Sequence, residues 1–150
     1  RKINDSMGAD VADAAIIKMI EAGAAPKKAT VVILGLTFKE NCPDTRNSKV
    51  VDIIDRLKGY GIKPVVADDW ADKEIAKEEY GVDLVPVSEI PKADCIIVAV
   101  GHNTFRSMSM MQIKGLFKDE LADEERVLID VKSLYRMDEL KASGMNFWRL

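Results

Sequence analysis

Two basic side chains lie close together in a long connection of the chain. Lys39 and Arg46 belong to segment 35–48, which joins a β-branched apolar run to a predicted helix. Ammonium and guanidinium groups bind anions through charge-assisted hydrogen bonds, and a helix N-terminus adds a favourable dipole. Because Glu40 and Asp44 lie in the same segment, a solvated loop with balanced charges is the alternative. Long connections in small domains are mostly functional, which favours an anion-binding loop.

The same segment lacks the pattern that cradles a dinucleotide. A dinucleotide-binding loop carries G-x-G-x-x-G after the first strand, so that its backbone can approach the pyrophosphate. Here Gly35 is the only glycine in segment 35–48. We therefore expect an anion at this loop to be held by side chains and by the helix N-terminus.

Other polar residues follow the remaining predicted strands. Asp68 and Asp69 end the second strand, where an acid can bind a ribose, although helix capping is the favoured interpretation. His102 is the only histidine, and the sequence shows no acid–base partner for it, which favours a hydrogen-bonding role at a helix start or in a loop over catalysis. Asp130 and Lys132 follow the fifth strand, at the edge where a ligand contact is expected.

The two cysteines do not form a recognisable reactive or metal site. Lys39 and Arg46 would favour a thiolate at Cys42, but the sequence supplies no base beside it. Cys95 lies inside a predicted buried strand, where a thiol acts as a small apolar group. Two cysteines are too few for a disulfide framework or a zinc cluster, so we expect reduced thiols, no metal and a cytoplasmic protein.

Composition narrows the classes of partner. The chain has 150 residues, and its 22 basic and 25 acidic side chains give a formal net charge of −3. This length fits one domain, and mild acidity without a basic block argues against a nucleic-acid or membrane-surface partner. No apolar run approaches the roughly 18 residues of a membrane helix, and no signal-peptide pattern opens the chain.

Apolar periodicity predicts the elements that must position these residues. Short apolar runs indicate strands at about 30–35, 63–68, 83–85, 94–100, 126–130 and 146–150. Spacings of three and four indicate helices at about 1–21, 48–58, 72–80, 108–116 and 137–141. Strands that alternate with helices form a parallel sheet with right-handed crossovers. We therefore predict an α/β fold, a Rossmann-like doubly wound parallel sheet preceded by a long N-terminal helix, with ligands outside the carboxyl ends of the strands.

The predicted first helix is long for a domain of this size. Its apolar residues include Ile3, Met7, Val11 and Ile17, mostly on one face, and about 20 residues span roughly 30 Å. Since the elements after residue 30 form a complete domain, we expect this stripe to pack in a homodimer interface. The chain begins at Arg1 rather than Met, and we interpret it as a piece of a longer protein.

Segment 35–50 carries a recognisable signature. Its sequence, GLTFKENCPDTRNSKV, resembles the G-(LF)-(AT)-F-K-x-(ND)-x-x-D-x-R-x-S pattern of the UDP-glucose/GDP-mannose dehydrogenase family. Segments 3–7, 98–106 and 129–132 also resemble this family, so the likeness covers essentially the whole chain. Within the family, segment 40–44 is most similar to dehydrogenases of UDP-N-acetylhexosamines, including the Vi-antigen type.

The resemblance implies an organisation and an activity. Residues 1–25 would be the end of the family's central dimerisation helix, and residues 30–150 its C-terminal UDP-binding domain. The family oxidises the C6 alcohol of a nucleotide sugar to a carboxylate with two NAD+, through a thiohemiacetal and a thioester on a cysteine. That cysteine and the domain that mainly binds NAD precede Arg1 in the family pattern, so we expect this chain alone to be inactive. In the UDP-N-acetylhexosamine branch, the product would be a uronic acid for surface polysaccharide synthesis.

The resemblance also assigns roles to individual residues. Phe38 and Lys39 match positions that contact the UDP-sugar, and Arg46 matches an arginine that reaches NAD on the other domain. Lys132 stands where the family often has a substrate-binding arginine, and a lysine cannot make the bidentate contact. Gly8 stands about where animal-type UDP-glucose enzymes carry an arginine that crosses to the neighbouring subunit.

Two alternatives come from other functional classes. One is a stand-alone nucleotide-sugar binding module without catalysis. The other is a structural dimerisation domain built on the first helix, against which the charged segment 35–48 argues.

Overall fold

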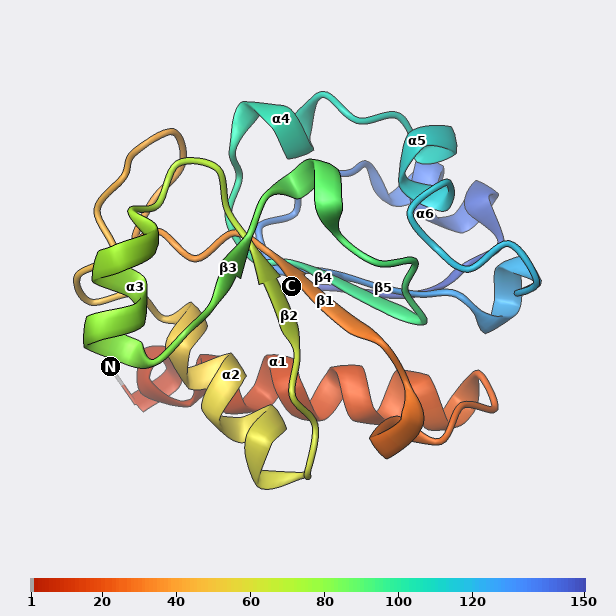
Figure 1. Cartoon of the computed structure of the whole chain (residues 1–150). Coiled ribbons are helices and arrows are strands. Elements are labelled where there is room, and N and C mark those ends of the chain that lie inside the picture. The colour runs from red at the N-terminus through yellow and green to blue at the C-terminus, as the bar shows by residue number, and fades with distance from the viewer. Residues whose placement is uncertain (1) are drawn as a thin grey trace.

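Within residues 2–150, which the computed structural model describes, six parallel strands form one sheet in the order β3-β2-β1-β4-β5-β6 (Figure 1). The strands are β1 (Val31–Leu34), β2 (Val65–Ala67), β3 (Leu84–Val85), β4 (Cys95–Val98), β5 (Val127–Asp130) and β6 (Asn146–Arg149). Chain order reverses between β1 and β4, the switch point at which doubly wound sheets bind ligands. The predicted Rossmann-like parallel sheet is therefore confirmed, including the edge strand at the end of the chain.

Helices cover both faces of this sheet (Figure 1). On one face lie α1 (Lys2–Glu21) and α2 (Val50–Gly59), whose apolar cluster also includes Ala76 of α3 (Lys73–Tyr80). On the other lie α4 (Asn103–Arg106), α5 (Met110–Lys114) and α6 (Met137–Ser143). Short 3₁₀ turns occur at Pro26–Lys28, Val87–Glu89 and Asp123–Glu125. Because both faces are covered, every residue of β1 and β4 is buried.

Side-chain caps set where two of the helices begin. The Asp72 carboxylate accepts two backbone N–H groups, at 2.9 and 3.1 Å, and starts α3. Ser109 and Gln112 form a reciprocal capping box, with bonds of 3.1 and 2.8 Å, and start α5. This box makes α5 shorter than the helix predicted at 108–116, and the separate turn α4 precedes it.

Helix α1 belongs to the core of this domain, which corrects the expectation that the domain is complete without it. Val11, Ala15 and Met19 are fully buried, where α1 packs against α2 and the β4–β6 half of the sheet. The physical reason is topological: α4, α5 and α6 cover the opposite face, and among the described helices α1 is the one that packs on β5 and β6 on this face. The predicted start at Arg1 and the side chain of Ile3 lie outside the described residues.

Two apolar side chains of α1 remain on the surface. Ile17, a residue of the predicted apolar stripe, is 55% exposed, and Ile20 is 60% exposed. Within residues 2–150, no helix is both long and apolar enough to cross a membrane.

The contact between α1 and α2 depends on a glycine. A side chain at Gly8 would overlap the Cβ of Asp52 and lie 3.2 Å from the Ile53 nitrogen. One turn further along, Asp13 accepts two hydrogen bonds from Arg56, at 3.0 and 3.2 Å, and one from Tyr60 at 2.7 Å. An arginine in place of Gly8 would therefore push the two helices apart.

We predict that Gly8→Ala destabilises the domain. The added methyl group overpacks the α1–α2 contact, which typically costs about 1–3 kcal/mol, against a gain of about 1 kcal/mol in helix propensity. Urea unfolding measures the change. Gly59→Ala is the matched control, because nothing lies within 4 Å of its added methyl group. Equal unfolding free energies for the two variants would contradict this account of the helix contact.

Candidate functional site

A hollow of about 260 Å³ opens beside the carboxyl ends of β1, β4 and β5. Its lining comes from the residues after these strands and from the starts of α1 and α2, namely Met7, Thr37, Phe38, Lys49, Val50, Ile53, Ala99, Val100, Val131 and Lys132. Phe38 and Lys132, two of the predicted substrate-binding residues, thus meet in one hollow. No acidic residue is among the described lining residues, so the hollow suits an anionic ligand with an apolar part.

Lys49 is the charged lining residue that sequence reasoning missed. It occupies the N-cap position of α2 without a side-chain capping bond. A cation at a helix N-terminus opposes the helix dipole, and this unfavourable placement was the available signal. Within the described side chains, neither Lys49 nor Lys132 takes part in an ion pair, so both charges are available to a ligand.

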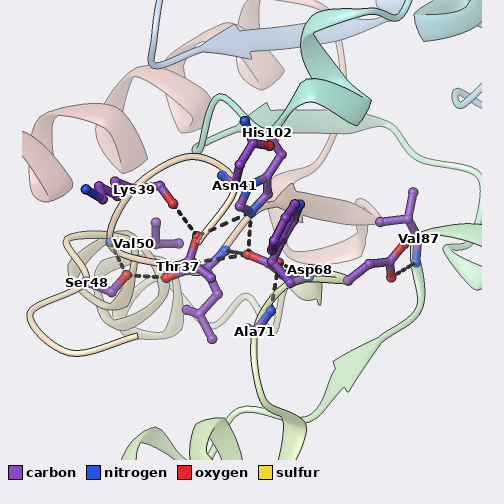
Figure 2. Close-up of polar contacts among 12 residues, drawn as sticks. Thr37, Lys39, Asn41, Ser48, Val50, Asp68, Ala71, Val87 and His102 are labelled. Atoms are coloured by element: carbon purple, nitrogen blue, oxygen red, sulfur yellow. Dashed lines mark hydrogen bonds and ion pairs between the residues drawn. The ribbon is translucent and has the colours of Figure 1, made fainter. Parts of the chain in front are cut away.

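The two cations of segment 35–48 lie outside the hollow. Lys39 is exposed beside Phe38, and its side chain extends away from the neighbouring polar network (Figure 2). Arg46 is 81% exposed and makes two parallel bonds to Asp44, both of 3.0 Å. The Arg46 guanidinium lowers the pKa of the Asp44 carboxyl through these hydrogen bonds. Arg46 therefore fits the alternative of a solvated loop with balanced charges, whereas Lys39 does not.

Backbone contacts give segment 35–49 a defined shape. The Phe38 N–H donates to the Asp44 carbonyl at 2.7 Å, which closes the loop on itself. The Ser48 hydroxyl donates to the Leu36 carbonyl at 2.5 Å and accepts the Val50 N–H at 3.2 Å. Ser48 thus ties the two ends of the loop together at the start of α2.

Gly35 is needed for close packing at the end of β1 and not for binding a phosphate. Its φ of +104° is accessible chiefly to glycine, and a Cβ there would lie 2.6 Å from the side chain of Val100. The rest of segment 35–48 contains no glycine, so no bare backbone is present against which a pyrophosphate could lie. These residues do not fit a dinucleotide cradle, as the sequence predicts.

The Asp68 carboxylate collects hydrogen bonds from two strand ends (Figure 2). One oxygen accepts the N–H groups of Leu36 and Thr37, at 2.6 and 3.1 Å, just after β1. The other accepts the N–H groups of Trp70 and Ala71, at 2.8 and 3.1 Å. Burial opposes the negative charge, but the His102 hydrogen bond and the N–H groups of Leu36 and Thr37 outweigh it and lower the pKa of Asp68.

His102 completes this network from the end of β4. Its imidazole is 1% exposed, with Nε2 at 3.0 Å from the Asp68 carboxylate and Nδ1 accepting the Asn41 N–H at 2.9 Å. Trp70 stacks on the ring at a centroid distance of 6.1 Å. The predicted hydrogen-bonding role of His102 at a helix start and in a loop is confirmed, because it precedes α4 and accepts the Asn41 N–H. Its acidic partner is not visible in the sequence, because β2 and β4 flank β1 and only the fold brings Asp68 and His102 together.

Three further expectations for acidic residues require correction. Asp68 binds loop N–H groups and His102, and Asp69 accepts the Val87 N–H at 3.0 Å, while Asp72 caps the helix. Asp130 is fully buried and accepts the N–H groups of the turn after β5, at 3.0 and 2.9 Å. Its predicted ligand contact is therefore wrong, since its carboxylate shapes the turn that presents Lys132.

The cysteines stay outside the site. Cys95 is fully buried in β4, and burial raises the pKa of its thiol, which keeps it protonated. Cys42 is half-buried in the loop. Among the described residues, no group of three histidine, cysteine or acidic side chains could hold a metal ion.

We predict that Asp68→Asn destabilises the domain by about 2–4 kcal/mol at pH 7, because it leaves buried donors unpaired. Since the native pKa of Asp68 lies below the ordinary value of 3.8, its contribution is present above that value and is lost as the pH falls further. Urea unfolding at pH 7 and in acid tests this. The exposed Asp69→Asn is the control, with an expected loss below about 1 kcal/mol. A similar loss in both variants would refute the role given to Asp68.

Comparison with known proteins identifies the family. The profile of the "UDP-glucose/GDP-mannose dehydrogenase family, UDP binding domain" matches residues 32–137. UDP-N-acetyl-D-glucosamine 6-dehydrogenase of Salmonella typhi is 42% identical over 134 residues, which cover 88% of this chain and 30% of that protein. Protein CapL of Staphylococcus aureus is 39% identical over 150 residues, covering 100% of this chain and 34% of that protein.

The chain thus spans about a third of the length of these relatives. Among solved structures, NDP-N-acetyl-D-galactosaminuronic acid dehydrogenase from Methanosarcina mazei Go1 superimposes with a TM-score of 0.83 at 24% identity, covering 99% of this chain and 30% of that one. This likeness supports the fold. Because the family profile spans most of the chain, as the signature at 35–50 predicts, the chain belongs to the UDP-glucose/GDP-mannose dehydrogenase family and contains its UDP binding domain.

Proposed function

We propose that the chain is the UDP-sugar-binding part of an NAD-dependent UDP-N-acetylhexosamine 6-dehydrogenase. The parent enzyme would work in the cytoplasm and oxidise the sugar C6 alcohol to a uronic acid for surface polysaccharide synthesis. Residues 1–25 would end its central helix, and residues 30–150 would form its C-terminal domain. The N-acetylhexosamine is favoured because the Salmonella typhi relative, 42% identical, is named for UDP-N-acetyl-D-glucosamine.

The observation that carries this proposal is the hollow at the switch point of the sheet. It combines the ammonium groups of Lys49 and Lys132, which form no ion pair with a described side chain, with the half-exposed ring of Phe38. A diphosphate needs cations, and a nucleoside or acetamido group packs on an apolar surface. We assign Lys49 and Lys132 to the diphosphate, Phe38 to the apolar part, and Lys39 to the exposed end of the UDP-sugar.

The chemical step itself would take place largely on other residues. NAD accepts the hydride when bound, and it would lie mainly on the preceding domain, with Arg46 at its edge. The buried Cys95 thiol is unsuited to attack a sugar aldehyde, because burial raises its pKa. This chain would therefore bind and orient the UDP-sugar, while the covalent intermediate would form on a cysteine of the preceding part.

We predict that Lys49→Ala and Lys132→Ala each weaken UDP binding to the chain about 10- to 100-fold. Each charge-assisted bond contributes roughly 1.5–3 kcal/mol, and about 1.4 kcal/mol is a tenfold change. Calorimetric titration measures the affinities. Lys58→Ala is the control, because it removes an exposed lysine from another hollow, near the start of β2. Unchanged affinity in both hollow variants, or no UDP binding by the chain, would overturn the proposed site.

The same titrations separate the two loop cations. In the parent enzyme, Lys39→Ala should weaken UDP-sugar binding about 10- to 100-fold and leave NAD binding nearly unchanged, while Arg46→Ala should do the reverse. The chain alone should bind UDP and produce no NADH from UDP-N-acetylglucosamine. Equal losses of both ligands in both variants, or NADH production by the chain, would contradict this division of roles.

We further propose that the parent enzyme forms a homodimer through α1. Among the described side chains of α1, Ile17 and Ile20 are the large apolar ones that remain exposed, whereas a charge at the fully buried Val11 would unfold the domain. We predict that Ile17→Asp with Ile20→Asp dissociates the parent dimer, as measured by light scattering. The control is Ile75→Asp, because Ile75 is 45% exposed on α3. A monomeric wild-type enzyme, or a dimer unaffected by the double change, would count against this interface.

A further inference from the structure

The hydrogen bonds of His102 define its protonation state. A backbone N–H can only donate, so the Asn41 N–H at 2.9 Å requires a lone pair on Nδ1. The remaining ring proton therefore lies on Nε2, where it points to the Asp68 carboxylate at 3.0 Å. His102 is thus a neutral imidazole of a single tautomer, held between an obligatory donor and a carboxylate.

Asn41 is the point at which this ring holds the loop (Figure 2). Besides its N–H bond to His102, the Asn41 side-chain oxygen accepts the Asn103 N–H at 3.0 Å. Its φ of +54° is a left-handed conformation, which asparagine tolerates better than most residues. Asn41 lies two residues after Lys39 and three after Phe38, so its position sets where these two side chains stand.

We infer that His102 is a positioning residue for the ligand loop, and that the loop stays in its binding shape only while Nδ1 carries no proton. This inference rests on the proposed function in that the ligand of the loop is a UDP-sugar. A second proton on Nδ1 would face the Asn41 N–H, and two donors cannot bond to each other. Protonation therefore breaks one of the two hydrogen bonds that hold Asn41, while its side-chain contact with the Asn103 N–H stays. The end of the loop that carries Phe38 and Lys39 is thereby loosened.

Among the described residues, the Asn41 N–H is the hydrogen-bond partner of Nδ1. The groups that contact the imidazole come from three elements, namely Thr37 and Asn41 in the loop, Asp68 and Trp70 after β2, and Phe105 in α4. The charged group among them is Asp68, which faces Nε2. The Thr37 hydroxyl, 3.3 Å from Nε2, donates to the Lys39 carbonyl at 2.9 Å. The four backbone N–H groups on Asp68 do not involve the ring, so we expect acid to loosen the loop and leave the strand ends in place.

Two substitutions separate the two nitrogens. The side-chain oxygen of His102→Asn can take the place of Nδ1 and accept the Asn41 N–H, but it does not reach Asp68. The amide of His102→Gln can take the place of Nε2 and donate to Asp68, but it leaves the Asn41 N–H unpaired. If His102 only stabilises the fold, His102→Gln should preserve its role better. If His102 positions the loop, His102→Asn should preserve its role better.

The test measures binding of UDP-N-acetylglucosamine to the 150-residue chain between pH 5 and 8. A terminal phosphate changes its charge near pH 6, whereas the diphosphate of UDP-N-acetylglucosamine is esterified at both ends and does not. With this probe, the charge of the ligand therefore stays constant over the pH range. We expect wild-type affinity to fall in acid, His102→Asn to bind with little pH dependence, and His102→Gln to bind about 5- to 10-fold more weakly at every pH. Tighter binding by His102→Gln than by His102→Asn, or equal losses in both, would overturn the inference.

A second readout requires neither a ligand nor a variant. His102 is the only histidine, so its ring nitrogens are assigned directly by nitrogen NMR. We expect a bare Nδ1 and a protonated Nε2 at neutral pH, and faster exchange of the Asn41 amide in acid after correction for the intrinsic rate. A proton on Nδ1, or an Asn41 amide that stays protected when the ring is charged, would overturn the inference. If the sugar nucleotide fails to bind while the NMR result holds, the proposed function fails and the loop contact stands.

Discussion

The buried carboxylate of Asp68 is the interaction on which the site depends. Burying a carboxylate is unfavourable unless donors replace its water, and here four backbone N–H groups and His102 do so. The donors come from the ends of β1, β2 and β4, which are neighbours in the sheet but far apart in the sequence. One charged group therefore fixes how three strand ends meet, and the loop after β1 leaves the sheet in one direction.

That direction decides which side chains face the ligand. The loop turns back through Ser48 onto Leu36, so the residue after it, Lys49, stands beside the hollow together with Phe38. On the far side, the buried Asp130 shapes the turn after β5 and presents Lys132. Both cations are thus supported by buried or half-buried polar groups that do not touch the ligand themselves.

Much of the fold could be predicted from the sequence. Fully buried strands have continuous runs of β-branched residues, and helices have apolar residues spaced three or four apart. The partners of His102 could not be predicted, since Asp68 lies on another strand with β1 between them. The structural role of α1 was missed for a related reason. The sequence pattern of an apolar stripe is the same whether the helix packs on its own sheet or on a second subunit. Segment 35–50 predicted the family. A cation at a helix start was the available sequence signal for Lys49, and the geometry of the hollow then placed it in the site.

The most direct measurement is a crystal structure of the chain with UDP-N-acetylglucosamine bound at neutral pH. We predict a diphosphate between Lys49 and Lys132, with the Asn41 N–H still on Nδ1 of His102. A ligand seated elsewhere, for example among the lysines near the start of β2, with Lys132 untouched, would contradict the account. So would a bound sugar nucleotide whose loop has left His102, because the loop would then bind without the support that Asp68 and His102 provide.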